Sequence, residues 1–345
     1  MREVELSGDY ERSNVELVEV ASAPRSPIRP RKARGLMMTA MLGCLLAISI
    51  PLLLEYLDDT IRTPEELEER VGVNVLGFVP HIARRGNQKK KHAHRLVVME
   101  EPDSSAIEAY RNIRTSLMFI APAEEVRTIL ITSGGPGDGK TTTACNLAAI
   151  MASSGKRILL VDMDMRRPTV HRVFGMENET GLTNLLVGEA EFDACVQKGR
   201  HGDKVLDMLD VMTAGTRPPN PTELIEAKAT RKLIETLSAK YDRIIIDSPP
   251  VLFVADASLI STFCDGVVLV ARSAKNARSQ ALRARRQLDS ASARILGGIL
   301  NDVTRWSQFY SEYYYYGYSR YYKDYYTAYY SENEDESTEA SERTG

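Results

Sequence analysis

A glycine-rich stretch near the middle of the chain has the residue types of a phosphate-binding loop. Residues 134–141 read Gly-Gly-Pro-Gly-Asp-Gly-Lys-Thr, between an apolar run and a helix-like run. Glycines let successive backbone N–H groups turn inward, and a helix N-terminus adds positive potential for a polyphosphate. The alternative, a glycine-rich turn at a helix start, is disfavoured by the strand–loop–helix context. We expect Lys140 to bind the β/γ-phosphates, Thr141 to bind Mg²⁺, and a nucleotide site formed by Gly134, Gly135, Pro136, Gly137, Asp138, Gly139, Lys140, Thr141 and Thr142.

Three aspartates follow two further apolar runs. Asp162 and Asp164 end the first run, and Asp247 ends the second. Acids beyond the carboxyl ends of parallel strands can orient Mg²⁺ and its waters or accept a proton from a hydroxyl. The structural alternatives are a capping residue and a surface acid. With the glycine-rich loop, the acids predict ATP and Mg²⁺ as cofactors, phosphoryl transfer, metal ligation by Thr141, Asp162, Asp164 and Asp247, and catalysis by Lys140, Asp162, Asp164, Arg166 and Asp247.

Tyrosine is concentrated at one end of the chain. Of the 16 tyrosines, 12 lie within residues 310–330, and an acidic stretch follows. No apolar period is present there, so we expect residues 306–345 to be a flexible tail. The alternative is a low-complexity aromatic segment that stacks on itself or on bases. Beside an ATP site we favour phosphoacceptors, at Tyr310, Tyr313, Tyr314, Tyr315, Tyr316, Tyr318, Tyr321, Tyr322, Tyr325, Tyr326, Tyr329 and Tyr330.

The elements that must position these residues alternate between strand-like and helix-like patterns. Helical stretches are expected at 141–153, 221–239 and 277–292. Strands alternating with helices imply βαβ crossovers, so we expect an α/β fold with a doubly wound, mostly parallel sheet in a domain spanning 101–305. The expected strands are 126–132, 157–161, 208–212, 243–246, 266–271 and 295–300.

Residues 35–54 contain no charge and are long enough, at about 1.5 Å per residue, to cross a bilayer as one transmembrane helix. The alternative is a buried core helix. Residues 1–34 are expected to be disordered or the remnant of a larger module. Residues 55–100 are expected to form a linker with a short helix from Thr63 and a basic stretch. Basic residues before the span place its N-terminal side in the cytoplasm, whereas a second basic cluster at 84–95 favours the opposite orientation or contacts anionic headgroups.

Composition excludes several classes of protein. The chain has 345 residues and a net charge of −3, and outside the acidic end it is only weakly basic. Bulk charge therefore gives no basis for nucleic-acid binding, and we expect none. The four cysteines are far apart and form no CxxC pair. This disfavours a disulfide scaffold or zinc knuckle and makes a reducing compartment the default.

In this order and context, the glycine-rich loop, the Asp-x-Asp-x-Arg strand end and the strand end at Asp247 resemble the bacterial protein-tyrosine kinases, relatives of the MinD/ParA-type P-loop ATPases. Residues 181–188 and 215–224 resemble further family segments, and the tyrosine-rich end resembles the family's autophosphorylated tail. Residues 12–82 resemble the end of a polysaccharide chain-length regulator (Wzz-type) module, with its second membrane helix. The MinD-type signature lysine is replaced by Gly135, which argues against that subgroup.

The resemblance implies a protein-tyrosine autokinase that phosphorylates its tail in trans, regulates exopolysaccharide or capsule biosynthesis and export, and forms ring-shaped homo-oligomers. It places Glu108, Arg111 and Arg114 at the subunit interface, although their spacing alone favours an exposed charged helix face. It also implies the bacterial inner membrane, with the kinase domain in the cytoplasm. The partners it implies are a separate chain-length regulator or activator, a tyrosine phosphatase and the polysaccharide export machinery.

The family's extracytoplasmic domain and first membrane helix do not precede this segment, which predicts either a fragment of a longer protein or a chain that works with a separately encoded partner. Two other functions stay open. One is a membrane-anchored MinD/ParA-like ATPase switch, and the other is a non-catalytic chain-length regulator scaffold.

Overall fold

The structure, a computed structural model, describes residues 32–82, 96–100, 104–275 and 278–304. The chain divides into two units, residues 1–58 and 59–345. The described part of the first unit is helix α1 (Lys32–Leu57), which contains Pro51. Within it, Arg34–Leu54 is long and apolar enough to cross a membrane. By length and composition, α1 is therefore a candidate membrane span.

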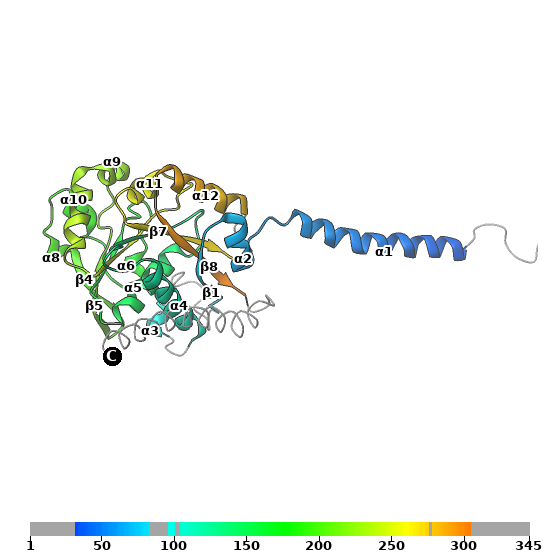
Figure 1. Ribbon diagram of the computed structural model, residues 1–345, viewed down its shortest axis with the longest axis horizontal. Helices are drawn as coiled ribbons and strands as arrows, with labels where there is room; N and C mark the ends of the chain where they lie inside the picture. The colour runs from blue at the N-terminus through cyan, green and yellow to red at the C-terminus, as the bar shows by residue number, and fades with distance from the viewer. Residues whose placement is uncertain (1–31, 83–95, 101–103, 276–277, 305–345) are drawn as a thin grey trace, which may run out of the picture. The chain divides into compact units, whose positions relative to one another are not determined.

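The second unit is built on an eight-stranded sheet with the order β1-β8-β7-β2-β6-β3-β5-β4 (Figure 1). Neighbouring strands are parallel, except that β4 is antiparallel to β5. This confirms the expected doubly wound, mostly parallel sheet. The strands are β1 (Val75–Pro80), β2 (Thr128–Ser133), β3 (Ile158–Asp162), β4 (Val196–His201), β5 (Lys204–Met212), β6 (Arg243–Asp247), β7 (Gly266–Arg272) and β8 (Ile295–Val303).

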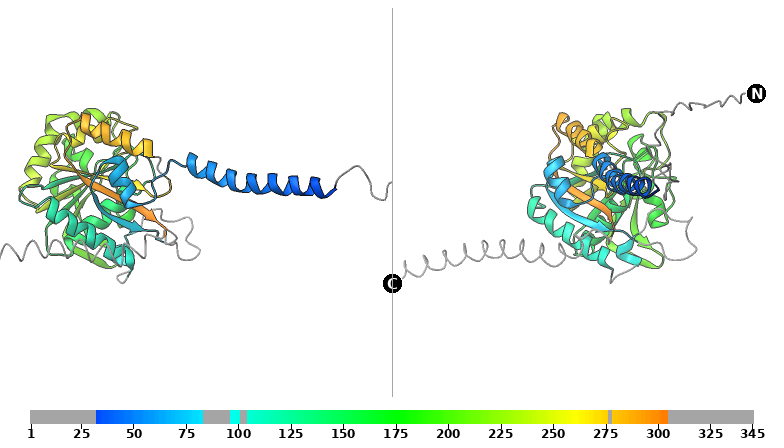
Figure 2. Two further views of the ribbon diagram at one scale, coloured as in Figure 1. Left: turned by 45° about the vertical axis from the view of Figure 1, so that its right-hand side comes forward. Right: turned by 90° about the vertical axis from the view of Figure 1, so that its right-hand side faces the viewer.

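Helices cover both faces of this sheet (Figure 2). One face carries α3 (Val97–Glu100), α4 (Ser105–Ile120), α5 (Lys140–Ala152) and α6 (Val170–Phe174). The other carries α7 (Leu182–Leu186), α8 (Phe192–Cys195), α9 (Pro221–Glu226), α10 (Lys228–Ser238), α11 (Asp256–Ser261) and α12 (Arg278–Ser290). Before β1, a short helix α2 (Pro64–Glu66) continues into a π-helical turn η1 (Leu67–Val71).

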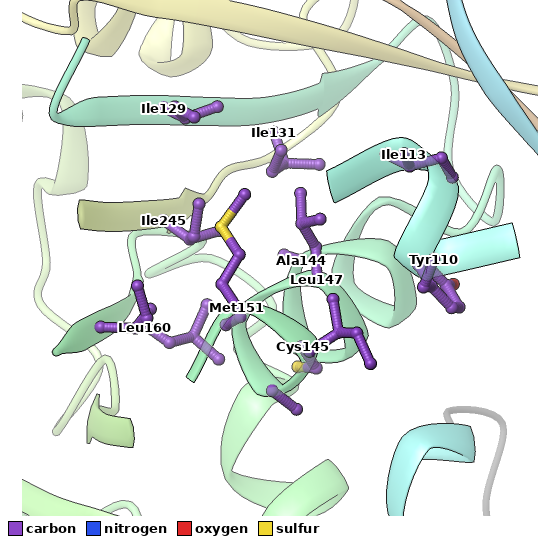
Figure 3. Close-up of a cluster of buried hydrophobic side chains, with 14 of the residues drawn as sticks. Tyr110, Ile113, Ile129, Ile131, Ala144, Cys145, Leu147, Met151, Leu160 and Ile245 are labelled. Carbon is purple, nitrogen blue, oxygen red and sulfur yellow. The ribbon is translucent and has the colours of Figure 1, made fainter. Parts of the chain in front are cut away.

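The central strands are buried on both faces because their side chains alternate between two hydrophobic clusters. In β2, Ile129 and Ile131 join the cluster beneath α4 and α5, whereas Leu130 joins the cluster on the opposite face. Figure 3 shows the first cluster, where Leu147 and Met151 of α5 lie among side chains of the sheet. The α5 helix that starts at the glycine-rich loop is thus anchored along its length by the core.

Four elements differ from the sequence expectations. Residues 75–80, which we placed in the linker, form the edge strand β1 beside β8; its glycine and terminal proline weaken the strand pattern in the sequence. Strand β4, also not expected, pairs at the other edge with β5, which begins at Lys204 rather than Met208. The expected helix 221–239 is interrupted at Ala227, whose φ of −57° and ψ of 139° are not helical.

Candidate nucleotide and phosphoryl-transfer site

The glycine-rich loop connects the end of β2 to the start of α5. Gly137 and Gly139 have φ angles of 78° and 98°, in the left-handed region that favours glycine. The Ser133 hydroxyl donates to the Gly135 carbonyl at 2.7 Å, and the Gly135 N–H donates to Asp138 Oδ2 at 2.8 Å. These hydrogen bonds fold the loop on itself ahead of the α5 N-terminus. The loop has the backbone of a phosphate cradle.

The aspartates lie on neighbouring strands beside this loop. β3 pairs with β6, and Asp162 is directly opposite Asp247 in their register. Thr141 Oγ1 donates to Asp247 Oδ2 at 2.7 Å, which joins the start of α5 to the end of β6. Lys140 Nζ lies 3.4 Å from Asp164 Oδ2. The fold therefore brings together Lys140, Thr141 and all three aspartates that sequence analysis selected.

Burial perturbs the ionisation of this cluster. Burial, and secondarily the charge of Asp247, raises the pKa of Asp162 to about 8. Burial also raises the pKa of Asp247 to about 6, although the Lys140 charge acts in the opposite direction. For Lys140, burial lowers the pKa, but the charges of Asp247 and Asp164 outweigh it and leave the pKa above its ordinary value. Such shifted values are typical of functional sites.

The donor set fits Mg²⁺. Asp247 Oδ1 is buried and has no hydrogen-bond partner, and the Thr141 hydroxyl contacts the other oxygen of the same carboxylate. Hard oxygen donors of this kind suit Mg²⁺, which usually takes one or two carboxylates and completes its shell with waters and substrate phosphates. Among the described residues, no three or more His, Cys, Asp or Glu side chains are grouped so that they could hold a metal ion.

Asp162 and Asp164 also organise the loop that follows β3. Asp162 accepts from the Asp164 N–H at 3.1 Å with one oxygen, and from the Thr169 and Val170 N–H groups at 3.1 and 3.0 Å with the other. Asp164 Oδ1 accepts from the Arg167 N–H at 3.0 Å. The four expected metal ligands therefore differ in their surroundings. Asp247 keeps one oxygen without a hydrogen-bond partner, whereas the Thr141 hydroxyl donates to Asp247 and accepts from the Thr169 hydroxyl at 3.2 Å.

Arg166 is hydrogen-bonded to residues outside the glycine-rich loop. Its Nε donates to Asp256 Oδ2 at 2.7 Å, and its Nη2 donates to Asp256 Oδ1 at 3.1 Å and to Thr222 Oγ1 at 2.8 Å. Thr222, in turn, donates to Asp256 at 2.8 Å. Sequence analysis missed Asp256, which nothing in its local pattern distinguishes. Thr222 lies in the 215–224 segment, whose family likeness was the available signal.

The expected interface residues lie on one helix, α4. Glu108 and Arg111 form an ion pair on its surface, each about half exposed. Arg114 is partly buried, and its Nη1 donates to the Ile150 carbonyl of α5 at 3.3 Å. Two of the three therefore lie on the surface, whereas Arg114 also helps to pack α4 against α5. The expected phosphoacceptor tyrosines, within 310–330, and residues 1–31 fall outside the described residues.

Comparisons with known proteins agree on one family. A family model described as "AAA domain" matches residues 126–281. Tyrosine-protein kinase YwqD of Bacillus subtilis is 40% identical over 220 residues, covering 64% of this chain and 91% of YwqD. Tyrosine-protein kinase etk of Escherichia coli K12 is 32% identical over 318 residues, covering 88% of this chain but only 43% of etk. The solved kinase domain of Escherichia coli ETK has a TM-score of 0.65 and 34% identity, covering 72% of this chain and 97% of that domain.

Proposed function

The chain belongs to the bacterial tyrosine-protein kinases, and we propose that it transfers the γ-phosphoryl group of ATP to tyrosines within its own residues 310–330. The observation that carries this proposal is the Thr141–Asp247 hydrogen bond, 2.7 Å long. It joins the phosphate-binding loop to a buried carboxylate with a second oxygen left for a metal. This is the arrangement that phosphoryl transfer requires, because its catalysis is mainly positioning and charge stabilisation.

In the proposed mechanism, the loop N–H groups and Lys140 bind the phosphates. Thr141 and Asp247 would hold Mg²⁺, which would supply positive charge to the phosphate oxygens. The tyrosine oxygen attacks the γ-phosphorus, its proton passes to Asp162 or Asp164, and the bond to the bridging oxygen breaks to leave ADP. Burial raises the pKa of Asp162 to about 8, so positive charge in the site must first ionise this carboxyl before it can accept the proton. Arg166, as positioned, holds Asp256 and Thr222 rather than phosphate.

We place this chemistry in a ring of copies in which one subunit's tail enters its neighbour's site. The exposed Glu108 and Arg111 on α4 are available for contacts between copies. Each added phosphate brings about −1.5 to −2 charges, so a phosphorylated tail repels its neighbours and loosens the ring. Assembly and disassembly then regulate an exopolysaccharide or capsule machine at the bacterial inner membrane. α1 anchors the protein, with the kinase unit on the cytoplasmic side, where ATP is available.

Purified full-length protein in detergent tests the activity. With radiolabelled ATP, wild type should carry label on the 310–330 peptide, and Lys140→Met should carry none. Lys232→Met, which removes an exposed lysine of α10, is the matched control and should keep the label. Full labelling of Lys140→Met would show that the site is misassigned. Release of free phosphate with no labelled peptide would identify an ATPase switch instead of a kinase.

The trans arrangement has its own test. Glu108→Ala combined with Arg111→Ala removes two half-exposed side chains, so the fold should persist while the oligomer dissociates in sedimentation measurements. Mixing Lys140→Met protein with a variant whose tail tyrosines are all phenylalanine should restore labelling of the Lys140→Met tail. An absence of label in that mixture would exclude transfer between subunits.

A further inference from the structure

Three consecutive carbonyl groups of the phosphate-binding loop are each bound by a side chain from outside it. Lys275 Nζ donates to the Pro136 carbonyl at 3.2 Å, and Arg272 Nη1 donates to the Gly137 carbonyl at 3.3 Å. Asn301 Nδ2 donates to the Asp138 carbonyl at 2.9 Å. The donors come from the end of β7, the turn after it and β8, which are neighbouring parts of the sheet (Figure 1). We call Arg272, Lys275 and Asn301 the carbonyl clamp.

Fixing these carbonyls affects phosphate binding because each peptide group is rigid and planar. Its N–H and C=O point in opposite directions, so holding one end limits the orientation of the other. A hydrogen bond to the carbonyl, especially from a cation, also polarises the peptide and strengthens its N–H as a donor. The clamp therefore acts on the loop from the carbonyl side, whereas phosphate is bound by the N–H groups.

The loop is fitted closely to this clamp. A Cβ added at Gly139 would lie 1.9 Å from Asn301 Nδ2, and one added at Gly137 would lie 3.1 Å from Lys275 Nζ. The overlap with Asn301 adds a steric requirement for glycine at position 139, and at both positions the φ angle already favours glycine. This contact adds a reason for Gly139 beyond the turn itself.

Arg272 is oriented by further residues. Its Nε and Nη2 both bind Asp302 Oδ2, at 2.6 and 2.5 Å, and Asp302 Oδ1 lies 2.5 Å from His81 Nδ1. Asp302 has a φ of 66°, an uncommon left-handed conformation for a residue other than glycine. The backbone N–H of His81, just after β1, donates to the Val303 carbonyl of β8 at 2.8 Å. A chain of contacts thus runs from the end of β1 to the phosphate-binding loop.

We propose that Arg272, Lys275 and Asn301 are positioning residues that preorganise the phosphate-binding loop for ATP, and that Asp302 and His81 act through Arg272. The inference rests on the proposed function in that ATP is the ligand of this loop. It assigns a role to residues at and after the carboxyl ends of β7 and β8, which the loop motif and the three aspartates do not include. Preorganisation improves affinity by reducing the ordering that the ligand must otherwise impose.

The primary measurement is calorimetric binding of Mg²⁺-ATP to the full chain in detergent, alongside KM and kcat for tail labelling. Arg272→Met should weaken ATP binding and raise KM for ATP about tenfold, with kcat at saturating ATP changed by less than about threefold. Arg272→Lys, which keeps a donor and charge, should recover part of the affinity. Arg286→Met, on the exposed face of α12, is the matched control and should bind like wild type.

A double-mutant cycle tests whether Asp302 acts on the loop through Arg272. Asp302→Asn alone should weaken ATP binding about threefold, and Asp302→Asn combined with Arg272→Met should be no worse than Arg272→Met alone. Lys275→Met, in an exposed turn, provides an independent variant whose loss should add to that of Arg272→Met. Thermal unfolding without nucleotide should leave Arg272→Met and Lys275→Met within a few degrees of wild type.

The inference is overturned if Arg272→Met and Lys275→Met both bind Mg²⁺-ATP like Arg286→Met, or if the effects of Asp302→Asn and Arg272→Met are additive. This result is separable from the proposed function. Protein that binds ATP through the clamp but labels no tyrosine would refute the kinase assignment alone. Protein that labels its tail equally well without the clamp would refute the clamp alone.

Discussion

Asp247→Asn should stabilise the nucleotide-free protein while abolishing tail phosphorylation. Asp247 is completely buried, and its Oδ1 has no hydrogen-bond partner. Burial raises its pKa to about 6, from an ordinary value of 3.8. Because the folded-state pKa is raised, the ionised form disfavours folding: the carboxyl does not reduce stability below about pH 4, and stability is lost as pH rises through about 6.

The magnitude follows from this difference in pKa. About two pH units, at about 1.4 kcal/mol each, give an upper limit of roughly 3 kcal/mol at pH 7. Asparagine can keep the acceptor for Thr141 and carries no charge, so we expect Asp247→Asn to gain about 1–3 kcal/mol without metal. For a domain of this size that corresponds to about 2–12 °C in Tm. Activity should fall by at least about 100-fold, because the variant lacks the anionic metal ligand.

The assay is thermal unfolding of the full chain at pH 7 in a chelator, followed by circular dichroism, and then with Mg²⁺-ATP. Asp256→Asn is the matched control, because Asp256 is also buried but is paired with Arg166 at 2.7 Å. Removing one partner of such a pair should lower stability by about 1–3 kcal/mol. Mg²⁺-ATP should raise the Tm of wild type more than that of Asp247→Asn. A lower Tm for Asp247→Asn than for wild type in chelator would refute the argument that the buried carboxylate is destabilising.

Three further outcomes follow from the same contacts. Because burial raises the folded-state pKa of both Asp162 and Asp247, metal-free wild type should lose stability as pH rises from about 5 to 8, with a smaller slope in Asp247→Asn; a flat Tm over this range would contradict the shifts. Thr141→Val should lower stability by about 1–2 kcal/mol and weaken Mg²⁺-dependent ATP binding, since Asp247 loses its hydrogen bond. Thr141→Ser should retain most of the stability and of the binding. Equal losses in the two variants would show that the hydroxyl is not the cause. Gly139→Ala should reduce ATP binding at least tenfold, because its φ is 98° and its Cβ would overlap Asn301; unchanged binding in calorimetry would show that the loop tolerates a different shape.

Short-range patterns identified the centre of the fold and of the candidate site. The glycine-rich loop and the aspartates at the ends of apolar runs were visible because both signals are local in the sequence. Parallel pairing then places Asp162 opposite Asp247, as expected for acids at the carboxyl ends of neighbouring strands.

Contacts between distant segments could not be predicted in this way. Asp256 holds Arg166 from 90 residues further along the chain, and His81 contacts Asp302 across 221 residues. Neither acid stands in a recognisable motif, so only the folded arrangement reveals its partner. Arg166 illustrates the consequence. Its place in Asp-x-Asp-x-Arg predicts a charge-stabilising role, but that local pattern gave no sign of the contacts that its Nε and Nη2 make with Asp256 and Thr222.

The two groups of residues around the loop differ in what they contribute to folding. Asp162 and Asp247 are buried carboxylates that the nucleotide-free protein holds at an energetic cost, and a bound cation would relieve it. The clamp residues instead pair with loop carbonyls before any ligand arrives. Substituting a buried carboxylate should therefore raise stability and lower activity. Substituting a clamp residue should weaken ATP binding and change the catalytic rate at saturating ATP only slightly. Without ligand, stability should rise in Asp247→Asn, fall in Asp256→Asn and stay close to wild type in Arg272→Met. This outcome would separate three roles around the loop: a carboxylate that disfavours folding, a structural ion pair and positioning of the loop.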